Sequence, residues 1–88
     1  MRLHIEVNVW KRIDENVLVR YRCFRILPDN KYVVQSADFY NLPLDDKQIS
    51  YLSKQFIQLL CEEEPAVRSD LFDSLEEAIA ARDLDFPI

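Results

Sequence analysis

Three stretches in the first half of the chain have the apolar patterning of β-strands. Residues 3–9 alternate between aliphatic and other side chains, so one face of this strand carries Leu3, Ile5, Val7 and Val9. Residues 17–27 and 31–40 are rich in valine, isoleucine, tyrosine and phenylalanine and contain no proline. The pattern predicts three consecutive strands.

The two connections between these strands are short, and each ends in asparagine. Residues 14–16 are Asp-Glu-Asn and residues 28–30 are Pro-Asp-Asn. Asparagine tolerates the left-handed backbone conformation that a three-residue hairpin loop requires. We therefore expect two antiparallel hairpins. The closing pairs are Ile13 with Val17 and Leu27 with Lys31.

This register sorts the strand residues onto two faces. The first face is largely apolar and should be the core face; its rows are Val9–Tyr21–Ala37, Val7–Cys23–Gln35 and Lys11–Val19–Phe39. The second face has the rows Trp10–Arg20–Asp38, Asn8–Arg22–Ser36, Glu6–Phe24–Val34, His4–Ile26–Tyr32 and Arg12–Leu18–Tyr40. A slip of one residue at either loop would exchange the faces of the strands beyond it.

The clearest helix signal begins after Asp45. Aspartate is a good N-cap, Gln48 follows at the spacing of a capping box, and Leu44 can pack on Ile49. Three glutamates followed by Pro65 end the helix, because a residue before proline avoids helical geometry. The apolar stripe of this helix suits the core face of the sheet and consists of Ile49, Leu52, Phe56, Leu59 and Leu60.

The remaining residues predict an extended segment and a short second helix. Residues 66–72 favour extended structure, with a short edge strand as the alternative. Asp73 or Ser74 then caps a helix whose apolar stripe is Leu75, Ala78 and Ile79. We expect residues 83–88 to form a tail. Its Leu84 and Phe86 either join the core or bind a partner.

These elements predict an α+β fold with one domain that spans residues 1–88. The expected order is β-β-β-α-(β)-α: a three-stranded antiparallel meander followed by two helices packed on one face. Two short helices can cover one face of such a sheet but hardly both. The second face should therefore be open, unless the second helix crosses it.

The composition removes several kinds of chemistry. The chain has no glycine, which excludes the glycine-rich loops that bind phosphate groups. Its one histidine, His4, and its two cysteines, Cys23 and Cys61, are not at metal-ligand spacing, so we expect neither a metal nor a cofactor. No apolar run is long enough to cross a membrane or resembles a signal peptide, and we expect a cytoplasmic protein. In that compartment two reduced, core-packed thiols are favoured over a Cys23–Cys61 disulfide.

The charge is distributed unevenly along the chain. Residues 1–40 have a net charge of +2 and residues 41–88 a net charge of −7, for a total of −5. An acidic chain repels nucleic acid and anionic lipid at long range. The acidic half offers an alternative function, in which the protein inhibits a basic partner as immunity proteins and antitoxins do. The acidic residues concerned are Asp70, Asp73, Glu76, Glu77, Asp83 and Asp85.

The second sheet face is the main candidate for a functional site. Aromatic residues and arginines together are typical of interface hot spots, and Trp10, Arg20 and Asp38 can form a cation–π and carboxylate stack. The predicted partner-binding residues are Trp10, Arg12, Arg20, Arg22, Phe24, Asp38 and Tyr40. The partner is another protein or a second copy of the chain; a homodimer would cover the apolar cluster Phe24, Ile26, Tyr32 and Val34.

Two other function classes are less consistent with the sequence. Single-stranded nucleic acid could stack on the aromatic residues, but the net charge and the acidic residues on the same face oppose this. Catalysis lacks a partner for His4, and Arg20 should hold the pKa of Asp38 low, which would make the carboxylate a poor base. We therefore expect a binding protein that is not an enzyme.

Overall fold

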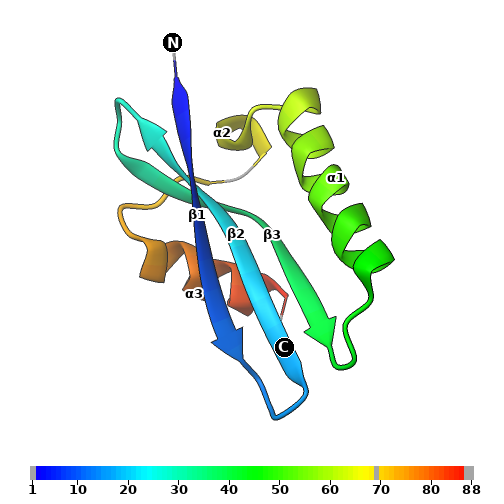
Figure 1. Cartoon of the computed structure of the whole chain (residues 1–88). Helices are drawn as coiled ribbons and strands as arrows, with labels where there is room; N and C mark the ends of the chain where they lie inside the picture. Colours follow the sequence, from blue (N-terminus) through cyan, green and yellow to red (C-terminus); the bar gives the residue numbers. More distant parts are fainter. Residues whose placement is uncertain (1, 69, 87–88) are drawn as a thin grey trace.

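The computed structural model describes residues 2–68 and 70–86 and has an α+β architecture (Figure 1). Three antiparallel strands form an open sheet in the order β1-β2-β3. Three helices follow the sheet. The elements are β1 (Leu3–Arg12), β2 (Val17–Leu27), β3 (Lys31–Asn41), α1 (Asp46–Glu62), α2 (Pro65–Arg68) and α3 (Leu75–Asp85). The predicted fold class and meander are confirmed.

The first hairpin has the predicted register. β1 and β2 pair from Leu3 opposite Leu27 to Arg12 opposite Leu18, and the amide of Ile13 donates to the carbonyl of Val17. The turn itself works differently from the prediction. Within it the carboxylate of Asp14 accepts a hydrogen bond from the Asn16 amide at 2.8 Å. This side-chain turn replaces the left-handed asparagine, which occurs only in the second hairpin, where Asn30 has a φ of 57°.

The second hairpin keeps the predicted register only in its half nearer Trp10. β2 and β3 pair as predicted from Val17 opposite Asn41 to Arg22 opposite Ser36, and a β-bulge then shifts the register by one residue. Gln35 is the extra residue, because Cys23 lies opposite Val34. The predicted neighbours beyond the bulge are therefore wrong. Phe24 pairs with Val33 rather than Val34, and Ile26 pairs with Lys31 rather than Tyr32.

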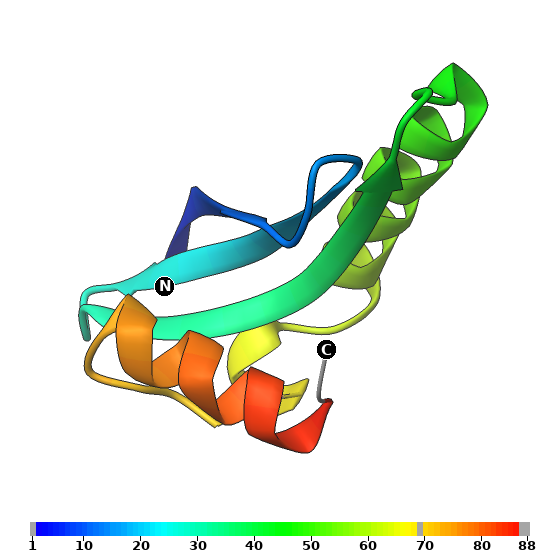
Figure 2. The ribbon, with the colours of Figure 1, turned by 90° about the horizontal axis from the view of Figure 1, so that it is seen from below.

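The two longer helices lie on opposite faces of the sheet, which contradicts the prediction that both pack on one face (Figure 2). Alternate residues of a strand point to opposite faces. Phe24 and Ile26 of β2 pack with Phe56 of α1 in one core cluster. The second cluster contains Val19, Tyr21 and Cys23 from the other face of β2 and includes Leu75 and Ile79 of α3.

α1 packs on the Phe24 face of the sheet because its apolar residues find apolar partners there. The ring of Phe56 stacks on Phe24 at a centroid distance of 5.3 Å, and both rings are buried. Phe24, Ile26 and Val33 together provide a larger apolar surface on this face than the arginine-containing rows suggest. The predicted N-cap of α1 is confirmed, because the Asp45 carboxylate accepts from the Lys47 amide at 2.9 Å.

The segment between α1 and α3 is mostly not extended. Pro65 begins the single helical turn α2, since its fixed φ suits the first position of a helix. Among the described residues of this segment, Phe72 alone pairs with the sheet, and it exchanges two backbone hydrogen bonds with Tyr32 at the outer edge of β3. The predicted extended structure is therefore correct at Phe72 and wrong at residues 66–68, and residue 69 lies outside the described residues.

The second long helix is capped as predicted but ends later. Ser74 accepts a hydrogen bond from the Glu77 amide at 3.1 Å, and α3 continues to Asp85. The predicted tail thus begins too early; Leu84 and Phe86 are exposed, and residues 87–88 lie outside the described residues. The last turn of α3 contacts the sheet. Asp83 accepts a hydrogen bond from the Tyr21 hydroxyl at 2.9 Å, which holds α3 on the sheet.

The two cysteines are free thiols in different environments. Cys23 is fully buried in the sheet, where burial raises the pKa of its thiol to about 11. Cys61 is exposed at the end of α1. The predicted absence of a disulfide is confirmed, whereas the prediction that both thiols are packed in the core is wrong for Cys61.

Replacing Phe56 with alanine should destabilise the protein by about 3–5 kcal/mol, because it removes the ring that joins α1 to the sheet. Urea unfolding followed by far-UV circular dichroism measures this loss. Ile57 directly follows Phe56 in α1 but is 59% exposed, so Ile57→Ala is the matched control and should cost less than about 0.5 kcal/mol. Equal losses would contradict the position of α1.

Alkaline pH should weaken the attachment of α3. Burial, and then the hydrogen bond to Asp83, raises the pKa of Tyr21 from 10.0 to about 12. The folded state therefore keeps a proton that the unfolded state releases, and this contribution to stability is complete below pH 10 and is lost as the pH rises towards 12. Urea unfolding across this range should show a steeper loss for the wild type than for Tyr21→Phe. The exposed Tyr51→Phe should behave like the wild type.

Candidate functional site

The predicted row of Trp10, Arg20 and Asp38 crosses all three strands. Trp10 lies opposite Arg20 in β1 and β2, and Arg20 lies opposite Asp38 in β2 and β3. These pairs lie in the part of the sheet before the bulge, where the sequence register holds. The predicted constellation is therefore present.

Arg20 is the centre of an aromatic stack. Its guanidinium carbon lies 5.2 Å from the centroid of Trp10 and 5.3 Å from the centroid of Tyr40. The same guanidinium donates a hydrogen bond to the Tyr40 hydroxyl and lies 3.7 Å from the Asp38 carboxylate. The two rings also contact each other, with centroids 5.8 Å apart, and the cation touches both of them and a carboxylate, which orients both rings. One side of the Trp10 ring is therefore supported by the guanidinium of Arg20.

Arg22 connects the same carboxylate to α1. Its Nε atom lies 2.7 Å from the Asp38 carboxylate, and its guanidinium donates to the Ser53 hydroxyl at 3.0 Å. The guanidinium carbon lies 4.9 Å from the centroid of Phe56. Because only 5% of the Arg22 side chain and 6% of the Asp38 side chain are exposed, the two charges depend on each other for compensation.

Burial sets the proton equilibria of this cluster. Desolvation raises the pKa of Asp38, and Arg20 acts in the opposite direction. This contradicts the expectation of a low pKa, which counted the arginine but not the burial. Desolvation also raises the pKa of Tyr40, so its hydroxyl stays protonated. The cluster is a largely buried ion-pair network.

The structure divides the predicted site into a buried part and an accessible part. Arg22, Phe24, Asp38 and Tyr40 are buried. Of the seven predicted partner-binding residues, Trp10, Arg12 and Arg20 keep accessible side-chain surface. The predicted dimer contact fails for the same reason. Phe24 and Ile26 are already covered by α1, and Val34 packs in the core cluster of the opposite face.

The accessible part of the site lies near the end of the sheet, beyond the cover of α1. Trp10 is 54% exposed and Leu18 is 39% exposed, and Arg12 is exposed between them on the same face. Leu18 was not among the predicted site residues, although the register places it opposite both Arg12 and Tyr40. We name Trp10, Arg12 and Leu18 the Trp10 platform.

The remaining titratable groups include His4, the single histidine of the chain. His4 packs edge-on against Phe24 at 5.6 Å and lies 3.8 Å from the Glu64 carboxylate. Among residues 2–68 and 70–86 no group of three histidine, cysteine or acidic side chains is placed to hold a metal ion. Within the same residues no helix is long and apolar enough to cross a membrane.

Comparison with known proteins gives no relative for this chain: no family model, no curated protein and no solved structure matches it significantly.

Replacing Asp38 with asparagine should destabilise the protein by about 3–5 kcal/mol, because Arg22 would remain buried without a counter-charge. Urea unfolding measures the loss. Glu6→Gln removes an exposed carboxylate from β1 and is the control, with an expected change below about 0.5 kcal/mol.

A second variant separates the ion pair from simple damage to the core. Asp38→Leu combined with Arg22→Met removes both charges and should recover most of the stability lost in Asp38→Asn. A double variant less stable than Asp38→Asn would contradict mutual compensation between these residues.

Proposed function

We propose that this protein is a non-catalytic binding module that recognises a protein partner through the Trp10 platform. The observation that carries the proposal is the state of Trp10, which is 54% exposed while its ring lies against a guanidinium held by Asp38 and Tyr40. An exposed ring with a rigid support loses little side-chain entropy when it binds.

The composition of the platform indicates the partner's chemistry. Trp10 and Leu18 provide apolar contact area, and exposed Arg12 lies beside them. Tryptophan and arginine are enriched among the residues that dominate binding energy at protein interfaces. The proposed partner therefore presents an apolar side chain next to a carboxylate, which would cover the indole and pair with Arg12.

The positions of the other arginines favour a protein over a nucleic acid. Only 18% of the Arg20 side chain and 5% of the Arg22 side chain are exposed, and both are committed to Asp38. A phosphate backbone needs several accessible cations. The stacking aromatic residue remains, but most of the basic residues that would accompany it face the interior.

In the acidic-inhibitor alternative, two of the acidic residues are already paired with other residues of this chain. Asp83 binds Tyr21 and Arg82, and Asp73 pairs with Lys31. These contacts give two of the six acidic residues a structural role. The alternative stays a prediction for the exposed acids of α3 and the segment before it.

Replacing Trp10 with alanine should abolish partner binding while leaving the fold intact. Partner proteins are captured from cell extract with the wild type, then purified, and their affinities for each variant are measured by titration. A hot-spot residue contributes about 2 kcal/mol or more, so Trp10→Ala should weaken binding at least about 30-fold. In the wild type the single tryptophan also reports binding through its fluorescence.

Ile57→Ala is the matched control, since Ile57 is 59% exposed on α1 away from the platform. It should change the affinity less than about twofold. Circular dichroism spectra of both variants should match that of the wild type. A partner that binds Trp10→Ala and Ile57→Ala equally well would remove the platform from the function.

A further inference from the structure

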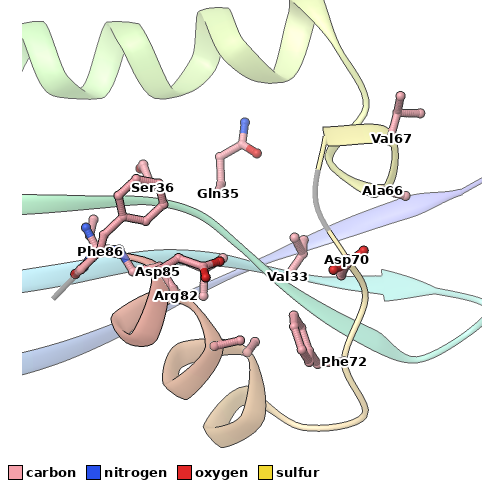
Figure 3. A pocket seen from close by; sticks show the side chains of 14 residues that line it. Val33, Gln35, Ser36, Ala66, Val67, Asp70, Phe72, Arg82, Asp85 and Phe86 are labelled. Atoms are coloured by element: carbon pink, nitrogen blue, oxygen red, sulfur yellow. The ribbon is translucent and has the colours of Figure 1, made fainter.

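The outer edge of β3 forms the floor of a groove of about 650 Å³ (Figure 3). Residues 33–37 line the floor. α2 contributes Ala66 and Val67 to the walls, and α3 contributes Ala78 and Ala81. Phe72 and Phe86 also line the groove. This volume lies in the range of ligand-binding pockets, and the small wall residues leave the strand edge approachable.

The edge of β3 presents backbone groups that the sheet does not use. The amide and the carbonyl of Tyr32 both bond to Phe72, so the backbone groups of Tyr32 point away from β2. In an antiparallel ladder this direction alternates, which makes Val34 the next outward residue. On the other side of the bulge, the amide of Leu42 donates to Asn16, so the backbone groups of Leu42 point inward. Because the direction alternates along the strand, the backbone groups of Ala37 point outward. No backbone hydrogen bond to these outward groups occurs among residues 2–68 and 70–86.

The bulge adds side-chain groups to this edge. Gln35 is the extra residue of the bulge, lines the groove and is only 8% exposed. Its Nε2 atom has no hydrogen-bond partner among the described residues, and neither has the Ser36 hydroxyl beside it. Buried polar atoms are normally hydrogen-bonded, because an unpaired one has lost its hydrogen bonds to water without replacement. An unpaired amide in a groove therefore points to a ligand with an acceptor.

The charges around the groove indicate the sign of that ligand. Asp70 and Asp85 line it, and both are exposed. The one basic residue that lines the groove among the described residues is Arg82, which is engaged with Asp83 at 3.4 Å and with the Phe86 carbonyl at 3.3 Å. The rim of the groove is thus acidic, in line with the net charge of −5.

We propose that the β3 groove binds an extended peptide segment of a partner protein, with small apolar side chains alternating with basic ones. The peptide adds a strand to β3 and pairs with the outward backbone groups of Val34 and Ala37. One of its carbonyl oxygens accepts from Gln35 Nε2. Its apolar side chains contact Ala66 and Val67 of α2 and Ala81 of α3, and its basic side chains reach Asp70 and Asp85.

This site is separate from the Trp10 platform. Trp10 belongs to β1, and the groove lies along β3 at the other side of the sheet. Trp10→Ala should therefore leave peptide binding unchanged. Failure of either proposal can be recognised without reference to the other.

The test uses a fluorescein-labelled peptide of alternating valine and lysine, titrated with the full chain and followed by fluorescence anisotropy. A peptide of alternating valine and glutamate is the charge control. Ala37→Pro removes one outward amide from the β3 edge, which is a position where a strand tolerates proline. Asn8→Pro is the matched control, because the backbone amide of Asn8 points outward on the free edge of β1. The amide of Ile13 points inward to Val17, and the direction alternates along the strand from Ile13 to Asn8.

We expect the lysine peptide to bind the wild type and Asn8→Pro alike and to bind Ala37→Pro about tenfold more weakly, the loss that one hydrogen bond of about 1.4 kcal/mol predicts. Gln35→Met keeps the side-chain size without the amide and should show a similar loss, which preserves the test if the proline variant does not fold. The glutamate peptide should not bind.

Three results would overturn the proposal. They are no binding of the lysine peptide at millimolar concentration, equal binding to all variants, and binding of both peptides alike. Sedimentation of the unliganded protein measures its oligomeric state and so tests whether a second copy of the chain occupies the groove. A wild-type dimer that Ala37→Pro abolishes would assign the groove to a second copy of this chain instead.

Discussion

The carboxylate of Asp38 joins the part of the sheet that α1 covers, through Arg22, to the uncovered part around Trp10, through Arg20. It compensates Arg22, which reaches Ser53 and the ring of Phe56, and it lies 3.7 Å from Arg20, which supports Trp10 and Tyr40. Three charges with so little solvent access are stable only as a group. The same carboxylate therefore supports one polar contact of α1 and the orientation of the exposed indole. In this protein the core and the candidate recognition surface share their supporting residues.

The sheet is small, yet it is covered on both faces, and this arrangement decides where a partner can bind. α1 takes the face with Phe24, and α3 takes the face with Tyr21. Accessible surface remains where the helices do not reach, near the Trp10 end of the sheet and along the outer edge of β3 between α2 and α3. Both proposed sites lie in such gaps. Each combines groups that the fold holds rigid with backbone or aromatic surface that the fold leaves uncovered.

Local chemistry explains why much of the sheet could be predicted. The short loops determine which residues face each other, and the row of Trp10, Arg20 and Asp38 follows directly from them. The error beyond Arg22 comes from Gln35, because an inserted bulge residue leaves no mark in a run of strand-forming residues. The same insertion creates the buried amide at the groove. A sequence-based register necessarily misses a site that depends on a local departure from that register.

The sequence by itself determined the three strands, the cap at Asp45 and the cation–π row, and it narrowed the cap of α3 to Asp73 or Ser74. Each of these features depends on residues close together in the chain or paired by short loops. Only the tertiary structure decided which face each helix covers. β2 alternates Tyr21 and Cys23 with Phe24 and Ile26, so both of its faces are apolar enough to form a core. Period-two alternation separates the two faces but does not rank them. The rank follows from packing volume and from partners distant in sequence, here the stacking of Phe56 on Phe24.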